Sequence, residues 1–170
     1  VGLVGIAKDI TEIKETRETL RRERDFVRGI IETSEICIVG LSVEDGRITL
    51  FNRGAERISG YDRDEAIGRP FADLLLAGER ADDLEKMIAD MPCATGEVRH
   101  VECPVRTKTG RERLMAWTNS VCCDAEERPT HVIAFGYDLT EQRQMQEKLE
   151  TAKNELQKAN AELKRVAATD

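Results

Sequence analysis

Five cysteines and two histidines are the residues of this sequence best suited to metal or redox chemistry. A Cys-x-x-Cys spacing would indicate a zinc or redox site, and a following histidine would indicate c-type haem. Neither spacing occurs, and an odd, irregularly spaced set is a poor disulfide framework. We therefore expect apolar fillers in a reducing cytoplasm. The cysteines are Cys37, Cys93, Cys103, Cys122 and Cys123.

Catalytic motifs are missing from the rest of the chain. The sequence contains no glycine-rich phosphate loop, no nucleophile elbow and no recognisable pair of catalytic carboxylates. The net charge of −7 argues against nucleic acid and anionic membrane surfaces as partners, since both attract basic patches. No apolar run approaches the roughly 20 residues that span a bilayer. We expect a cytoplasmic, non-enzymatic segment with no catalytic and no metal residues.

An internal repeat divides the chain. The segment IAKDITEIKETRETL begins at Ile6, and its echo FGYDLTEQRQMQEKL begins at Phe135. In each copy an apolar, strand-like run meets Asp-x-Thr-Glu and then a charged helical segment, with the aspartate placed to cap the helix. This pattern predicts the tail of an earlier domain at 1–9, a linker helix at 10–33, one complete domain at 34–141 and a helix at 142–170.

The complete domain has the pattern of an α+β fold. Apolar runs at 36–41 and 48–51 flank a Glu-Asp-Gly turn, and three more strands are expected at 98–107, 111–123 and 131–137. Between the second and third strands, Asn52 is placed to cap a short helix that Gly60 ends. Further helices are expected at 63–67 and 79–90. The order favours one five-stranded antiparallel sheet with short helices over one face.

The C-terminal helix has two interleaved heptad series of apolar residues, spaced as a and d positions. The residues are Met145, Leu149, Ala152, Leu156, Ala159, Leu163 and Val166. We expect them to form the seam of a homodimer that pairs through its flanking helices. The alternative is a single amphipathic helix packed on its own domain. Alanine at alternate core positions buries little area, so a paired seam would be weak.

The series FNRGAERISGYDRDEAIGRPF, RTKTGRERLMAWTNSV and HVIAFGYDLTEQRQ resembles a PAS domain with its C-terminal PAC segment. The resemblance covers about residues 34–141. It implies a sensory module in which Asp138 and Thr140 pass a signal from the last strand to the output helix. It also implies a cavity or core between sheet and helices, for which Phe51, Trp117 and Phe135 are candidate lining residues.

The closing ELKRVAATD resembles the segment that leads into a GGDEF domain, the catalytic unit of diguanylate cyclases. This likeness implies a bacterial sensor that regulates cyclic di-GMP synthesis by a ligand, a redox change or dimer rearrangement. The alternatives are a ligand-free dimerisation and spacer module, or the sensor of a histidine kinase.

The cofactor stays open, with a small-molecule ligand, no ligand, and flavin as alternatives. Photoreactive flavin relatives carry a cysteine after the Gly-Arg at 68–69, where this chain has Pro70, so adduct chemistry is not expected. Haem is not expected either, because His100 and His131 both fall on strand candidates. Trp117 occupies a type of position found in flavin-binding relatives, and it equally suits a packed core.

Overall fold

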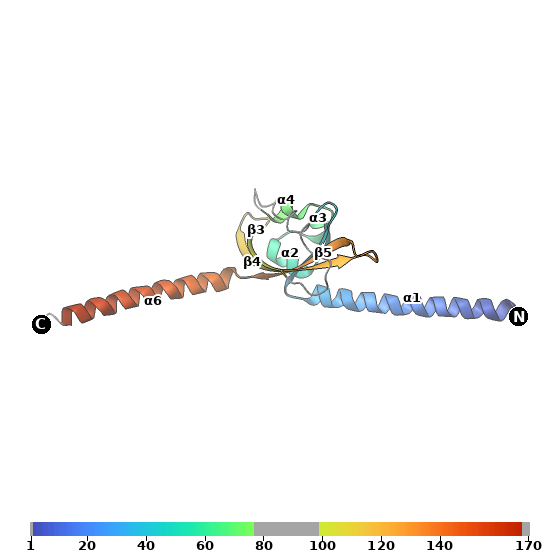
Figure 1. Ribbon diagram of the computed structural model, residues 1–170, viewed down its shortest axis with the longest axis horizontal. Helices are drawn as coiled ribbons and strands as arrows, with labels where there is room; N and C mark the ends of the chain where they lie inside the picture. Colours follow the sequence, from blue (N-terminus) through green and yellow to red (C-terminus); the bar gives the residue numbers. More distant parts are fainter. Residues whose placement is uncertain (1, 77–98, 168–170) are drawn as a thin grey trace.

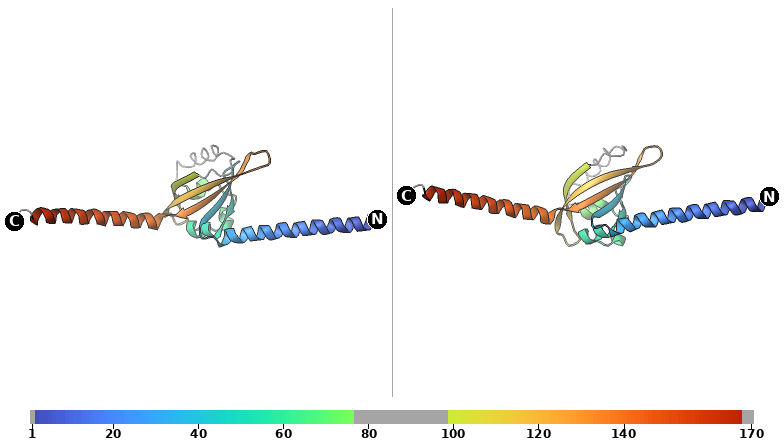
Figure 2. Two further views of the ribbon diagram at one scale, coloured as in Figure 1. Left: turned by 60° about the horizontal axis from the view of Figure 1, so that its bottom comes forward. Right: turned by 90° about the horizontal axis from the view of Figure 1, so that it is seen from below.

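The computed structural model describes residues 2–76 and 99–167. Two long helices flank a domain, α1 (Gly2–Thr33) before it and α6 (Thr140–Ala167) after it. They extend away from opposite sides of the domain, with the two termini at the far ends (Figures 1 and 2). Only the last turns of α1 and the first turn of α6 therefore meet the domain.

The domain is built on one antiparallel sheet of five strands in the order β2-β1-β5-β4-β3. The strands are β1 (Cys37–Ser42), β2 (Ile48–Phe51), β3 (Arg99–Arg106), β4 (Glu112–Cys123) and β5 (Pro129–Asp138). Strand β5 lies in the centre and pairs with both β1 and β4. The expected fold class and strands are confirmed. The last strand in the sequence is the central strand of the sheet.

Among the described residues, three short helices cover one face of the sheet (Figure 1): α2 (Arg53–Ser59), α3 (Arg63–Ala66) and α4 (Phe71–Leu75). Helix α2 begins and ends where the sequence predicts. The side chain of Asn52 accepts from the amide of Ala55, and Gly60 ends the helix with a φ of 79° that suits glycine.

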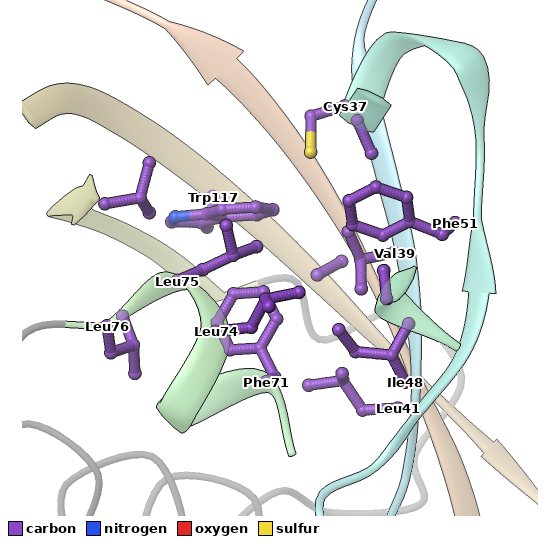
Figure 3. Packing of buried hydrophobic residues seen from close by; sticks show 14 of the residues in the cluster. Cys37, Val39, Leu41, Ile48, Phe51, Phe71, Leu74, Leu75, Leu76 and Trp117 are labelled. Atoms are coloured by element: carbon purple, nitrogen blue, oxygen red, sulfur yellow. The ribbon is translucent and has the colours of Figure 1, made fainter. Parts of the chain in front are cut away.

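The apolar core fills the space between the sheet and these helices (Figure 3). Alternate residues of β1 and β5 face it, such as Val39, Leu41, Val132 and Ala134. Phe71, Leu74 and Leu75 of α4 close it from the helical side. The core holds α4 on the sheet, whereas α1 contributes none of its described side chains to this cluster.

One segment has a different secondary structure here from the one expected. The strand-like run at residues 3–7 belongs to α1, so Asp9 falls within the helix and not before its start. A single strand without neighbours leaves its backbone amides and carbonyls unpaired, whereas a helix pairs them internally. The helix expected at 79–90 lies outside the described residues.

Candidate functional site

Asp138 and Thr140 form a compact bracket where β5 ends and α6 begins. The Asp138 carboxylate accepts a hydrogen bond from the amide of Thr140 at 2.9 Å. The Thr140 hydroxyl in turn accepts from the amide of Leu114 on β4, also at 2.9 Å, and the amide of Leu139 donates to the Leu114 carbonyl at 2.8 Å. The start of α6 is therefore bonded to the neighbouring strand as well as to its own.

Arg113 completes the bracket. Its guanidinium donates to Asp138, whose side chain is only 20% exposed. Partial burial alone would raise the pKa of Asp138, but the hydrogen bonds from Thr140 and Arg113 outweigh it and hold the pKa below its ordinary value. The carboxylate is thus charged at neutral pH and makes directional bonds to both partners. Arg113 escaped prediction because its contact depends on the register that sets Met115 opposite Asp138.

Asn52 does more than cap α2. Its side-chain oxygen also accepts from the amide of Ile38, and its side-chain nitrogen donates to the carbonyls of Ile31 and Ile36 at 2.9 and 3.0 Å. The residue is fully buried. One side chain therefore connects the last turn of α1, strand β1 and helix α2, and only its role as a cap is visible in the sequence.

The core beside α4 contains a buried polar atom that has no hydrogen-bond partner among the described residues. Trp117 is 5% exposed, and its ring packs edge-to-face against Phe71 with the centroids 5.7 Å apart (Figure 3). Its Nε1 is buried and has no hydrogen-bond partner within the described residues. Gly136 lies beneath the ring, where a Cβ would come within 2.7 Å of it. A buried indole N–H usually has an acceptor, so this donor is the feature of the core that best suits the binding of a ligand.

The three residues proposed to line the cavity or core do not share one surface. Phe51 and Trp117 belong to the core cluster. Phe135 is half-buried between the buried positions Ala134 and Gly136, and it is not part of that cluster. Because side chains alternate along a strand, Phe135 lies on the opposite face of the sheet, which corrects its expected place.

The cysteines and histidines are dispersed. His100 and His131 are both exposed, and across the described ranges no three His, Cys, Asp or Glu side chains are grouped as a metal site would require. Burial raises the pKa of the Cys37 thiol to about 12. Cys123 is disulfide-bonded in the structure, contrary to the expectation that every cysteine is an apolar filler.

The predicted seam of α6 is open to solvent in the single chain. Met145, Leu149, Leu156 and Leu163 each expose between 63% and 70% of their surface, and the intervening Ala152 and Ala159 are also exposed. The side chain of Val166 lies outside the described ones. Helix α1 has its own exposed apolar residues, including Leu20 and Phe26. In this structure neither helix buries these side chains on its own domain.

Within residues 2–76 and 99–167, no helix combines the length and apolar character needed to cross a lipid bilayer.

A five-stranded antiparallel sheet with short helices on one face, entered and left by long helices, defines the class of PAS sensor domains. The PAS fold family model matches residues 25–139, more than half of the sequence. The chain belongs to the PAS family.

The chain is similar to several known proteins. The probable diguanylate cyclase DgcE of Escherichia coli (strain K12) is 32% identical over 73 residues, which are 43% of this chain and only 6% of that protein. The PAS domain of an HTR-like protein from Haloarcula marismortui superposes with a TM-score of 0.62 at 21% identity, covering 74% of this chain and 98% of that one. The PAS domain of the RpfR quorum-sensing receptor from Cronobacter turicensis, in complex with C12:0, gives 0.53 at 24% identity, covering 65% and 99%.

Proposed function

We propose that this chain is a sensory module that passes a change in its core through α6 to an output domain. The observation that carries the proposal is the bracket of Asp138, Thr140 and Arg113, which bonds the first turn of α6 to two strands of the sheet. A shift of β4 against β5 changes the direction of α6, because hydrogen bonds fix geometry more strictly than apolar contacts do.

The output domain we propose is a diguanylate cyclase. The support is the GGDEF-like lead-in at the end of the sequence and the partial match to DgcE. The test is cyclic di-GMP synthesis from GTP by the full-length protein, with Asp138→Asn as the variant and Glu141→Gln as an exposed neighbouring control. We expect Asp138→Asn to change the regulated rate and the control to leave it unchanged. Autophosphorylation without cyclic di-GMP synthesis would instead favour a histidine kinase.

The signal we propose is a small molecule that offers one hydrogen-bond acceptor to Nε1 of Trp117 within an otherwise apolar core. The RpfR PAS domain in complex with C12:0 is a solved example of a PAS domain bound to a ligand. Native mass spectrometry and an absorption spectrum of the purified protein test the proposal. Extra mass that Trp117→Phe reduces supports it, and bands near 370 and 450 nm would identify the ligand as flavin. A protein of bare polypeptide mass with a flat spectrum would favour the ligand-free dimerisation module.

The assembly we propose is a cytoplasmic homodimer paired along α1 and α6. The exposed seam of α6 supports it, since isolated amphipathic helices gain stability by burying such a stripe. Sedimentation equilibrium should give a dimer that Leu156→Lys dissociates and that Lys158→Glu, on the polar side of the same helix, does not. A monomer at high micromolar concentration would count against the seam.

We propose that residues 1–9 are the tail of a preceding PAS-like domain, in line with the internal repeat, and that the run at 3–7, helical in this structure, pairs as its final strand when that domain is present. In a longer protein that includes the preceding domain, hydrogen exchange should show strand-like protection that stops at Asp9. Continuous helical protection through residues 2–33 would mean that α1 keeps its full length there too.

A further inference from the structure

Arg63 connects three elements of the domain. Its Nε donates to the carbonyl of Phe51 at the end of β2 at 2.7 Å, and its terminal nitrogen donates to Glu32 of α1 at 2.5 Å. Its backbone amide donates to Glu56 of α2 at 2.8 Å. Arg63 is also the first residue of α3. One residue therefore joins the incoming helix to the sheet and to two of the helices that cover it.

The Arg63–Glu32 pair is protected from solvent more than the other ion pairs of α1. The two side chains are 31% and 24% exposed, against 77% and 56% for Arg21 and Asp25 in the middle of the helix. The second carboxylate oxygen of Glu32 is buried and has no hydrogen-bond partner in the described part of the chain. Surface pairs contribute little, but a partly buried carboxylate that loses its cation is costly.

Helix α1 depends on this contact for its direction. The helix extends away from the domain (Figure 2), and the described residues from 12 to 30 are all exposed. At 1.5 Å per residue its 32 residues span about 48 Å, so a small tilt at the domain end moves the far end by many ångströms. The contacts that set the tilt are those of Glu32 with Arg63 and of the Ile31 carbonyl with Asn52.

Further ion pairs lead from Arg63 toward α6. Glu65, on the same short helix α3, pairs with Lys108 in the β3–β4 turn at 2.6 Å. Strand β4 leaves that turn and carries Arg113, which pairs with Asp138 at the start of α6. Rigid elements joined by such pairs are one physical form that coupling between distant sites takes.

We propose that α1 is a second input to this domain, and that Arg63 is the positioning residue through which movement of α1 reaches the α6 junction. The domain would then combine two signals, one from its core and one from whatever precedes α1. The inference rests on the proposed signalling function for its purpose. Its test needs neither a ligand nor an output domain, so the two proposals can fail separately.

The test is amide hydrogen exchange, followed by mass spectrometry, on the whole chain with Arg63→Gln, Glu32→Gln and the double variant. Arg63→Gln leaves a partly buried carboxylate unpaired, so we expect exchange at 26–33 to quicken by about tenfold or more. Glu32→Gln should have a smaller effect, because the guanidinium keeps the Phe51 carbonyl and a neutral acceptor. The double variant should exchange more slowly than Arg63→Gln, since the unpaired charge is gone.

The decisive readout is at the other end of the domain. Arg63→Gln should also quicken exchange at 139–145 by about twofold to fivefold, while the amides of β1 and β5 and the fluorescence of Trp117 show an intact core. The matched control is Arg53→Gln. Arg53 is exposed, and it lines together with Arg63 a groove of about 670 Å³ beside α1 and α2. It should change neither end.

Three results would overturn the proposal: unchanged exchange in Arg63→Gln, strictly additive effects of the two single substitutions, or faster exchange at 26–33 with none at 139–145. The last would make Arg63 a local brace for α1 and no input. If Arg63→Gln fails to fold, Glu32→Gln still decides the matter, because it must quicken exchange at both ends to a lesser degree.

Discussion

Replacing Asn52 by alanine removes four hydrogen bonds from a site with no access to water. The two accepted bonds come from the amides of Ile38 and Ala55, and the two donated bonds go to the carbonyls of Ile31 and Ile36. At a net value of about 1 kcal/mol for each bond, Asn52→Ala should reduce the free energy of unfolding by about 4 kcal/mol. That is a large part of the roughly 5–15 kcal/mol that stabilises a typical domain.

Asn52→Asp separates the two halves of this network. The aspartate keeps the oxygen that accepts from the two amides, but it presents a second oxygen to the carbonyls of Ile31 and Ile36. At pH 7 that buried charge should cost at least as much stability as alanine does. Burial and the facing carbonyls raise the pKa of the introduced carboxyl in the folded state. Stability should therefore recover as the pH falls through that raised value, since the protonated acid can donate one bond.

Urea unfolding followed by tryptophan fluorescence measures both variants, because Trp117 is the single tryptophan and lies in the core. Asn160→Ala on the exposed face of α6 is the control and should shift the free energy of unfolding by no more than about 0.5 kcal/mol. A loss below about 1 kcal/mol for Asn52→Ala would refute the reasoning, and so would a stability of Asn52→Asp that does not improve on acidification.

Three further outcomes follow from single residues. Gly54→Ala should reduce the free energy of unfolding by about 2 kcal/mol or more, because its Cβ would lie 2.0 Å from a carbonyl of the linker after α1. Gly29→Ala has open space around it in α1 and should raise the free energy of unfolding by up to about 1 kcal/mol. Urea unfolding and circular dichroism measure the two variants. The stability difference between wild type and Asp138→Asn should hold above about pH 5 and shrink below pH 4, since the folded-state pKa of Asp138 is lowered; a difference that grows on acidification would contradict this. Iodoacetamide at pH 8 should modify the exposed Cys122 quickly. It should modify Cys37, whose pKa is about 12, only after the protein unfolds, and peptide mass spectrometry would show the difference. Equal rates for the two thiols in the folded protein would rule out the burial of Cys37.

The strands could be predicted from the sequence because each is a local pattern of apolar residues between turn signals. β4 was expected from residue 111 and begins at Glu112, and both ends of α2 were predicted from Asn52 and Gly60. The order of the strands could not be predicted this way. It depends on β5 entering between β1 and β4, which are distant in sequence.

The repeat shows where local pattern fails. Residues 3–7 and 131–136 have similar apolar character, but only the second segment has neighbouring strands to pair with, and only it is a strand. The same limit applies to the junctions. Asp138 and Thr140 stand out in the sequence, whereas Arg113 and Arg63 look like any other exposed arginine until the register and the end of α1 bring their partners close.

Both junctions are polar, and the core between them is apolar. Apolar contacts are non-directional and would let a helix rotate over a surface at little cost, whereas a hydrogen-bonded ion pair holds one orientation. The contacts at Arg63 and at Asp138 therefore suit elements that must transmit direction. An input can shift such an element only by the difference in free energy with which it favours one orientation over another. The proposed dimer seam, with Ala152 and Ala159 at core positions, would oppose such a shift only weakly, so a modest change at either junction would suffice to move α6.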